Sequence, residues 1–481
     1  MAGEIAQHSK ATLIGYLLGE CANSLVVNGI FGFSLLFSTN ALGLDPRWAG
    51  IAMAISVFWE ALTEPIMGYM SDRTHSRWGS RHPYILCGGL LMAVGSYWIW
   101  TVPAWCHGSP AAIFSYWLTV NLILRTGLTL FFIPYMALGF EIYQDDHARL
   151  RLQGLRQIFN MAANFAGPAL AWILFFGGKD NQQATHIEAN YQRMGASFAI
   201  ATAILVTCVV VFTWSARVRV QVTRRVSKPM RAIIRDFLRE MKSILVDANA
   251  RWIFVFVFMI CIGMVLVSSL QMFIYDDFMQ FSAWQKFVVH GGTMIGMAAG
   301  AFCSIRLNQR FDKKQTIALG GVISIFGNLM LVALFLTGAV KRAGIDGSTA
   351  MILFGFFHAI YWFGNGVMLP ISNAMLADVS EIRRHRTQVA CEGSYSAVFS
   401  LAMRMAISLG LLISGGCLSA AGYQAASRDR SSIQTPHAIW NLAMVAFLVS
   451  AGICLIALAA IWRHPISRQR MAAMRDQWSN D

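Results

Sequence analysis

Apolar blocks recur along this chain, each about 20 residues or longer and thus able to cross a hydrocarbon layer of about 30 Å as a helix. Inside lipid, every backbone N–H and C=O must be paired within a helix or a closed barrel, and blocks of this length predict helices. Hydrophobic residues make up 56% of the sequence and charged residues 13%. This composition excludes a soluble enzyme, a disordered chain and a fibrous protein, so we expect an all-α membrane protein.

The apolar blocks define twelve predicted spans. The block at 11–38 is too long for the apolar core of a signal peptide, so we expect it to be retained as the first helix. The spans are 11–38, 48–71, 83–103, 112–140, 152–176, 195–216, 250–276, 286–306, 315–338, 348–378, 389–417 and 437–463. An even number of spans places both ends of the chain on the same side of the membrane.

The positive charges orient these spans. Most of the 38 Lys and Arg residues lie near the two ends of the chain and in the loops after the second, fourth, sixth, eighth and tenth spans. The positive-inside rule therefore predicts that both termini are cytoplasmic. Topology also explains the net charge of +14, so the partner it indicates is the lipid bilayer and not a nucleic acid. We expect a multi-pass protein of the cell's inner membrane that functions as a monomer.

A polar segment at 217–249 divides the spans six and six, and similar loops recur in the two halves. The loop Asp72–Gly79, for example, corresponds to Arg306–Lys314. We expect an N-terminal six-helix bundle at 1–216, a basic cytoplasmic linker at 217–249, and a C-terminal six-helix bundle with a short tail at 250–481. Two homologous bundles around a central pathway are typical of secondary transporters.

The second span carries a specific motif. It reads Trp59-Glu60-Ala61-Leu62-Thr63-Glu64-Pro65-Ile66-Met67-Gly68 and continues through Asp72-Arg73-Thr74 to Ser76-Arg77-Trp78-Gly79 and Pro83. This stretch resembles the signature of the glycoside–pentoside–hexuronide:cation symporters, a group of the major facilitator superfamily. The likeness covers the whole chain and includes Ile133-Pro134, Arg156, Ala377-Asp378 and Glu392. It implies the major facilitator fold, alternating access, no enzyme activity, and no cofactor beyond a coupling Na⁺ or H⁺.

The acidic pair of this motif is the predicted cation site. Glu60 and Glu64 lie four residues apart, on one face of the helix and close to the middle of the membrane, with Thr63 beside them. Two such carboxylates in a low dielectric must share a proton, bind a cation or pair with arginine. The resemblance implies that the cation binds Glu60, Glu64 and Thr129, with Thr63 in the intervening polar position. The alternative is a Glu–Arg pair that only ties helices together.

Three arginines, Arg125, Arg156 and Arg404, fall within spans. A planar guanidinium suits carboxylates and sulfonates, and the resemblance places Arg156 and Arg404 at cationic positions of the family. The predicted substrate-binding residues are Arg125, Arg156 and Arg404 together with Glu20, Asn23 and Ser24 of the first span. Two alternatives stay open: Arg156 as an interfacial cation, and Glu20 as its ion-pair partner.

The charges inside the spans favour an acidic solute. Three glutamates, Glu20, Glu60 and Glu64, face three arginines, so a cation bound at the acidic pair leaves one positive charge uncompensated. An anion neutralises that charge, whereas a neutral sugar does not. The family's acidic sugar-binding positions fall on Ser24 and Phe132, which points the same way. We expect a uronide, sugar acid or sulfonate, with a glycoside as the alternative.

The loop after the second span is the predicted cytoplasmic gate. Asp72 ends this span, where the helix dipole disfavours an anion, and with Arg73, Arg77 and Arg81 it resembles the cytoplasmic-gate loop of the superfamily. Charge pairs and helix-end dipoles there would hold the two bundles together, and the alternative is a solvated loop.

Taken together, the sequence predicts a secondary active transporter that couples a solute to Na⁺ or H⁺. The alternatives are an intramembrane transferase, which would need a concentrated catalytic constellation, and a proton-coupled exporter or sensor with the same fold.

Overall fold

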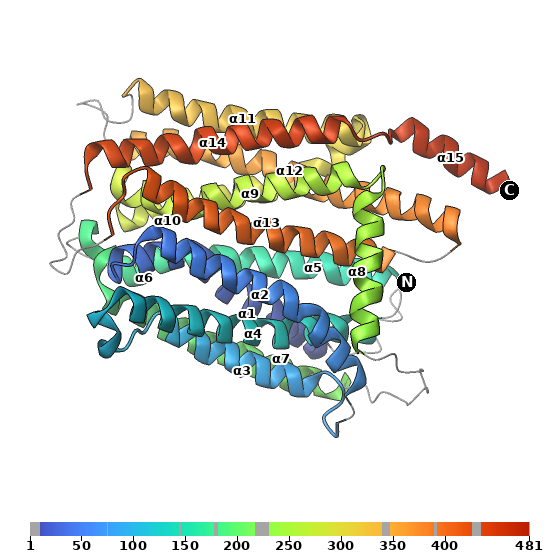
Figure 1. Ribbon diagram of the computed structural model, residues 1–481, viewed down its shortest axis with the longest axis horizontal. Helices are drawn as coiled ribbons and strands as arrows, with labels where there is room; N and C mark the ends of the chain where they lie inside the picture. The colour runs from blue at the N-terminus through green and yellow to red at the C-terminus, as the bar shows by residue number, and fades with distance from the viewer. Residues whose placement is uncertain are drawn as a thin grey trace. The chain divides into compact units, whose positions relative to one another are not determined.

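The computed structural model describes residues 10–74, 76–143, 146–177, 181–216, 230–338, 347–388, 392–425 and 434–480, and the regular structure within these ranges is helical (Figure 1). The α-helices are α1 (Lys10–Leu36), α2 (Pro46–Arg73), α3 (His82–Trp98), α4 (Pro110–Ile142), α5 (Asp146–Asn164), α6 (Leu170–Phe176), α7 (Glu188–Thr213), α8 (Met230–Val246), α9 (Arg251–Phe273), α10 (Ala283–Arg310), α11 (Lys313–Leu336), α12 (Gly347–Thr387), α13 (Glu392–Ala420), α14 (Pro436–Trp462) and α15 (Arg468–Asn480). The π-helical segments η1 (Phe37–Ala41), η3 (Phe165–Ala169) and η6 (Ile274–Phe278) continue α1, α5 and α9, and η2 (Ala104–Gly108), η4 (Asn181–His186) and η5 (Trp214–Ala216) are short 3₁₀ turns.

All twelve predicted spans are helices. Among the described residues, 11 helical segments are long and apolar enough to cross a membrane, and α3, with 17 residues, is the remaining predicted span. The all-α membrane fold is therefore confirmed. The boundaries differ most at α7, which begins at Glu188 and not at 195, and at α12, which continues past 378 to Thr387.

Polar caps fix where helices begin at the loops. The Asp45 side chain accepts a hydrogen bond of 2.8 Å from the backbone N–H of Arg47, and Pro46 takes the first position of α2, where no donor is needed. Asp312 opens α11 with a capping box, in which the Gln315 side chain bonds back to the Asp312 backbone N–H at 3.2 Å. These caps set the first residues of α2 and α11, which the apolar runs in the sequence do not locate on their own.

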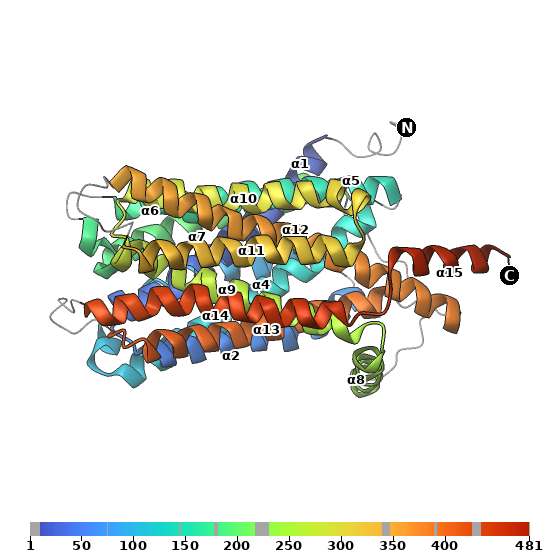
Figure 2. The same cartoon turned by 90° about the horizontal axis from the view of Figure 1, so that it is seen from above.

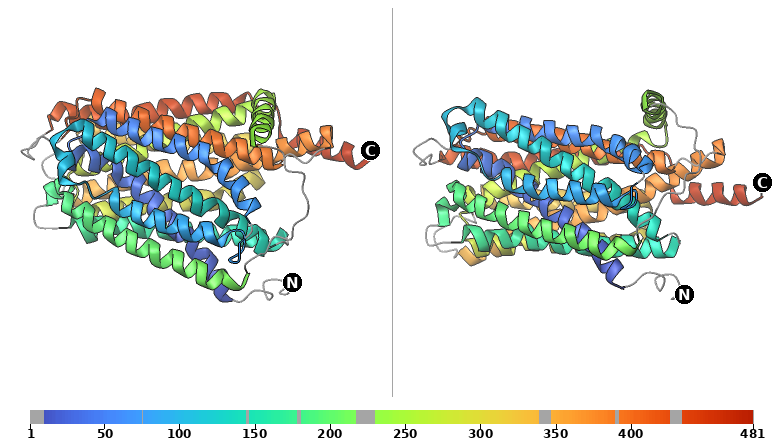
Figure 3. Two further views of the ribbon diagram at one scale, coloured as in Figure 1. Left: turned by 60° about the horizontal axis from the view of Figure 1, so that its bottom comes forward. Right: turned by 90° about the horizontal axis from the view of Figure 1, so that it is seen from below.

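The chain forms two compact units. Unit 1 comprises Met1–Thr223, Ser268–Phe287 and Leu411–Leu442. Within it, α2, α4, α3 and α7 lie side by side, and α1 packs on both α7 and α5 (Figure 3). Small residues allow this approach, because a Cβ on Gly88 of α3 would lie 2.4 Å from the Phe131 backbone nitrogen of α4. This packing brings α2, α4, α1 and α5, which carry most predicted site residues, into one unit.

Unit 1 also contains the ends of α9 and α13 that the positive-inside rule assigns to the outside. At this outer end, Gly50 of α2 meets Gly415 of α13 through backbone alone. A Cβ on Gly50 would lie 2.9 Å from the Leu411 carbonyl oxygen, and one on Gly415 would lie 2.4 Å from the Pro46 carbonyl oxygen. Nearby, Arg47 Nε donates to Ser419 Oγ at 2.7 Å. The first and second halves of the sequence therefore touch at their outer ends.

Unit 2 comprises Arg224–Val267, Val288–Gly410 and Ala443–Asp481. Its helices α11 and α12 pack closely, while α8 runs across the direction of α9 and α11 and is seen end-on in Figure 2. The predicted basic linker at 217–249 thus contains a helix, and residues 217–229 lie outside the described ranges. The division of the chain into 1–216, 217–249 and 250–481 stays a prediction.

Candidate functional site

Glu60 and Arg125 form a buried ion pair between α2 and α4. Arg125 Nη1 donates to Glu60 Oε2 at 2.7 Å, and the two side chains are 1% and 5% exposed, respectively. The Arg125 guanidinium also lies 5.5 Å from the ring centroid of Phe31. Arg125 Nε is buried and has no hydrogen-bond partner among the described residues. One predicted cation ligand and one predicted substrate ligand are thus direct partners.

The two threonines of the predicted cation site also meet. Thr63 Oγ1 and Thr129 Oγ1 lie 3.3 Å apart, and Thr63 donates within α2 to the carbonyl oxygens of Trp59 and Glu60 at 3.1 Å. Glu64, one turn beyond Glu60, is half-buried. Hydrogen bonds within α2 and between α2 and α4 therefore join Glu60, Thr63, Thr129 and Arg125, with Glu64 next to them on α2. Carboxylate and hydroxyl oxygens of this kind suit a hard cation.

A second buried ion pair joins α1 to α5. Arg156 Nε and Nη2 donate to Glu20 Oε2 at 2.9 and 2.6 Å, and Asn160 Nδ2 donates to Glu20 Oε1 at 2.9 Å. Gln153 accepts from Arg156 Nη1 at 3.0 Å, and the guanidinium lies 5.5 Å from the Tyr135 ring centroid. The alternative that Glu20 pairs with Arg156 is therefore what the structure contains. Asn160, Gln153 and Tyr135 are additional polar neighbours that sequence reasoning missed, because each is an ordinary residue in an apolar or amphipathic run.

The other two polar residues predicted on α1 differ from each other. Ser24 is buried, donates to the Asn160 carbonyl oxygen at 3.0 Å, and accepts from Asn28 Nδ2 at 2.8 Å. Its hydroxyl is thus engaged in helix packing between α1 and α5. Asn23 is half-buried on α1.

Arg404 is the last of the predicted substrate ligands. It belongs to α13 within unit 2 and is half-buried, whereas the other predicted substrate ligands belong to unit 1. Its role in substrate binding stays a prediction.

Of the three arginines expected around Asp72 in the gate loop, Arg81 is the one that binds it. Asp72 pairs with Arg81 Nη2 at 2.7 Å, and Arg81 also binds Glu141 Oε1 through Nε at 2.8 Å and Nη2 at 2.7 Å. Arg73 instead donates to the Tyr69 hydroxyl, and Arg77 is exposed. Burial lowers the pKa of Arg81, but the Glu141 and Asp72 carboxylates outweigh it and raise the pKa overall. Arg81, close to α3, therefore ties together the ends of α2 and α4 that the positive-inside rule assigns to the cytoplasm.

We expect Arg81→Ala to destabilise the protein more than Asp72→Asn. Arg81 is buried and hydrogen-bonded to two charged partners, so its loss costs about 1.5–3 kcal/mol. The Asp72 side chain is 64% exposed, and its loss costs at most about 1 kcal/mol. Melting temperatures of the two purified variants in detergent check this order. An Asp72→Asn variant that melts below Arg81→Ala contradicts it.

The structure contains buried charges that the sequence count omitted. Asp276 in η6 pairs with Lys286 of α10, and Asp277 follows in the same turn. Asp276 is the last residue of one predicted span, Asp277 lies in the loop after it, and Lys286 is the first residue of the next span. Charged residues are common at such boundaries, so the count of charges inside the spans left them out. The count of three glutamates against three arginines is therefore incomplete for the described residues.

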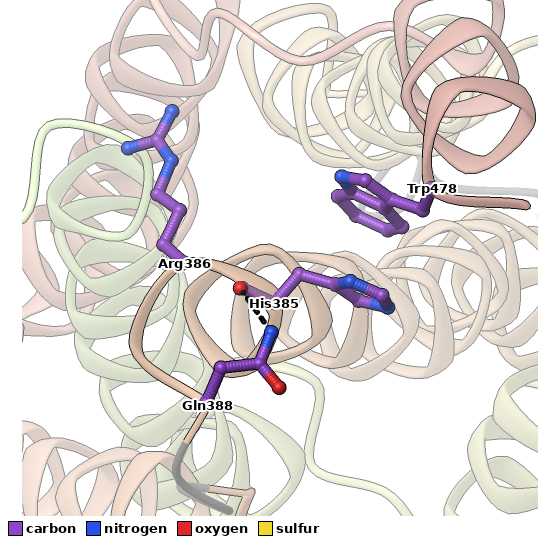
Figure 4. A pocket seen from close by; sticks show the side chains of 4 residues that line it. All are labelled: His385, Arg386, Gln388 and Trp478. Carbon is purple, nitrogen blue, oxygen red and sulfur yellow. Dashed lines mark hydrogen bonds between the residues drawn. The ribbon is translucent and has the colours of Figure 1, made fainter. Parts of the chain in front are cut away.

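One cavity lies in unit 2, at the C-terminal end of α12. It measures about 420 Å³ and is lined by His385, Arg386, Gln388 and Trp478 of α15 (Figure 4). The His385 and Trp478 rings stack with centroids 4.0 Å apart, and Gln388 Nε2 donates to the His385 carbonyl oxygen at 2.9 Å. Arg475 of α15 binds Glu381 at 2.6 Å. No predicted site residue lines this cavity, so its residues serve to hold α15 on α12.

Comparison with known proteins agrees with this arrangement of helices. The family model described as MFS/sugar transport protein matches residues 15–468. The chain is 25% identical over 472 residues to the glucuronide carrier protein homolog of Escherichia coli (strain K12), which covers 96% of this chain and 94% of that protein. It is 23% identical over 453 residues to the isoprimeverose transporter of Lactiplantibacillus pentosus, covering 92% and 86%.

Among solved structures, the crystal structure of a D-xylose-proton symporter matches with a TM-score of 0.62 at 15% identity, covering 95% of this chain and 96% of that one. At this identity the likeness concerns the fold alone.

Proposed function

Because the chain belongs to the MFS/sugar transport protein family, that of the glycoside–pentoside–hexuronide:cation symporters, we propose that it carries an acidic sugar-type solute into the cell together with Na⁺ or H⁺. Membership of a transporter family excludes the intramembrane transferase considered above. We further propose that the protein resides in the inner membrane with both termini in the cytoplasm. Small solute, coupling cation and lipid are its expected partners.

The observation that carries the proposal is the Glu60–Arg125 pair beside Glu64 and the two threonines. In our proposal the coupling cation binds Glu60, Glu64, Thr63 and Thr129. Arg125 Nη1 lies 2.7 Å from Glu60 Oε2. A cation or proton that binds Glu60 therefore competes with Arg125 for this carboxylate. A guanidinium that is 1% exposed needs a counter-charge. Binding of the cation therefore leaves Arg125 in need of another anion.

The solute supplies that anion. Arg125 already has one buried nitrogen, Nε, without a hydrogen-bond partner among the described residues, so it has donors to offer to a carboxylate or sulfonate. Arg156, held by Glu20, is the second proposed ligand, with Asn23 and Arg404 as further ones. A relative named for glucuronide carriage supports a sugar acid as the solute class. Cation and anion then each favour the binding of the other, and the coupling is reciprocal.

Transport into proteoliposomes tests this function. A sugar acid such as a uronide should accumulate against its gradient when a Na⁺ or pH gradient is imposed, and a matched uncharged glycoside should accumulate much less. Na⁺ coupling would make uptake rise with external Na⁺ at fixed pH and membrane potential, whereas H⁺ coupling would follow pH alone. Solute efflux driven by a proton gradient would support the exporter alternative, and binding without flux would support the sensor.

A further inference from the structure

A buried polar cluster lies at the outer end of unit 1, away from the proposed ion and solute sites. It brings together Asp276 and Asp277 of η6, Lys286 of α10, Asn40 of η1 and Tyr423, which follows the turn after α13. Gly422 forms this turn with a φ of 85°, a backbone conformation that favours glycine. Both acidic residues and Asn40 lie in π-helical segments, which occur often at functional sites.

Asp276 has its charge balanced within this cluster. Lys286 Nζ donates to its carboxylate, and the Thr185 hydroxyl donates to its other oxygen. Lys286 is 2% exposed, and its Nζ lies 4.6 Å from the Trp172 ring centroid. The lysine is therefore paired with Asp276.

Asp277, unlike Asp276, is hydrogen-bonded to the Tyr423 hydroxyl. Tyr423 Oη lies 2.8 Å from Asp277 Oδ2 and 2.9 Å from Asn40 Oδ1. A phenol carries one proton and can donate to only one acceptor at a time. The hydrogen-bond chain is complete only if one of the two neighbours donates to Tyr423.

Two arrangements meet this condition. In the first, Asp277 is protonated and donates to Tyr423, which donates to Asn40 Oδ1. In the second, the Asn40 amide lies the other way round, its nitrogen donates to Tyr423, and Tyr423 donates to an ionised Asp277. Asn40 Nδ2 is buried without a hydrogen-bond partner among the described residues. Turning the amide only replaces an unpaired nitrogen by an unpaired oxygen, so hydrogen bonding does not favour the second arrangement.

Electrostatics favours the first arrangement. An ionised Asp277 would place a second negative charge beside Asp276, in a site where the lysine is already paired. Among the described residues, His186 of η4 and Tyr191 of α7 are further titratable groups near the two carboxylates. Burial lowers the pKa of His186, so this ring is neutral at neutral pH and supplies no positive charge.

We propose that Asp277 binds a proton when the outer ends of the helices are in contact, in a chain that runs from Asp277 through Tyr423 to Asn40. The proton comes from the outside water, forms the O–H bond of the Asp277 carboxyl, and returns to that water when the contacts separate and the carboxylate is hydrated. Acid outside therefore favours the closed outer end. This proton site is distinct from the proposed coupling site at Glu60 and Glu64, and only its link to gating rests on the proposed function.

Infrared spectroscopy of the purified wild-type protein tests protonation without any transport. A protonated carboxyl group gives a carbonyl band separate from the bands of carboxylates. At neutral pH this band should be present in wild type and in the control Asp45→Asn, which changes an exposed helix cap, and it should lose one carboxyl's intensity in Asp277→Asn. Equal band intensity in wild type and Asp277→Asn overturns the proposal in favour of the turned Asn40 amide.

A second variant tests the same hydrogen-bond chain independently, in case Asp277→Asn does not fold. In Asn40→Ala, Tyr423 loses its other acceptor and can donate to Asp277, which stabilises the ionised carboxylate. The protonated band should therefore be weaker than in wild type at the same pH, and an unchanged band contradicts the chain.

Labelling of a cysteine introduced at Ser419, with the native cysteines replaced by serine, tests the link to gating. At each pH the labelling rate is divided by the rate of the same cysteine in the denatured protein, which removes the pH dependence of the thiolate's own reactivity. This ratio should decrease as the pH falls, and the Asp277→Asn change should abolish its dependence on pH. Persistent pH dependence in that variant refutes the link.

Discussion

Glu60→Gln is expected to abolish gradient-driven accumulation of the solute, the largest functional effect that the structure implies for one residue. The amide cannot take up a proton at neutral pH, and it is a poorer ligand for Na⁺ than a carboxylate. The same change leaves the 1% exposed Arg125 without its anionic partner, which costs up to about 3–5 kcal/mol of stability. Uptake into proteoliposomes and the melting temperature in detergent measure the two losses separately.

A double variant separates coupling from folding. Glu60→Gln with Arg125→Gln removes both charges of the pair and should recover most of the lost stability, while accumulation stays absent. Glu64→Gln is the companion variant, because it changes the neighbouring carboxylate and leaves the Glu60–Arg125 contact of 2.7 Å in place. If Glu60→Gln and Glu64→Gln each still concentrate solute against a gradient, the cation site lies elsewhere.

Arg156→Ala should produce the largest loss of solute affinity. A desolvated guanidinium paired with a solute carboxylate is worth about 2–5 kcal/mol, so an acidic solute should bind roughly 30-fold more weakly or worse. An uncharged analogue of the same solute should lose much less. Calorimetric titration of both ligands gives the two ratios, measured on protein that retains its fold.

The control for Arg156 is its partner. Arg156 and Asn160 both donate hydrogen bonds to the buried Glu20. Arg156→Ala removes the charged one of these two donors, so part of any loss of solute affinity reflects a carboxylate left without its counter-charge. Glu20→Gln with Arg156→Gln removes both charges. An acidic solute that binds this double variant as tightly as wild type would falsify the role of Arg156 in recognition, even if the single variant is impaired.

The helices were predictable because each span is an apolar block, and the main errors have local physical causes. α8 alternates basic and apolar residues, so its hydropathy is that of a linker although its pattern is amphipathic. α12 continues past its apolar part through Arg383 and Arg386, since charged residues prolong a helix once it has left the lipid. Hydropathy predicts where a helix leaves the membrane, whereas the end of the helix is set by its backbone hydrogen bonds, and the two positions can differ.

Part of the candidate site was predictable from helical spacing alone. Arg125 lies one turn before Thr129, which placed it on the face of α4 toward Glu60, and the two side chains do meet. The sequence grouped Arg73, Arg77 and Arg81 around Asp72, but it did not indicate which of the three binds this carboxylate. Arg73 and Arg77 are nearer in sequence, but Arg81 reaches Asp72 because the chain turns back between α2 and α3. The Asp277–Tyr423–Asn40 chain joins residues up to 383 positions apart, and no local pattern marks it.

The contact between Gly50 and Gly415 has a consequence for how fast the protein can turn over. Two backbones meet there with no side chain between them, so separation breaks no ion pair and renewed contact requires no search among rotamers. The surfaces fit again as soon as they approach. The rate of each cycle should therefore be limited by breaking and re-forming the hydrogen bonds around this contact, such as Arg47–Ser419 and Tyr423–Asn40. The glycine contact itself should add little to the barrier when the outer ends separate and meet again.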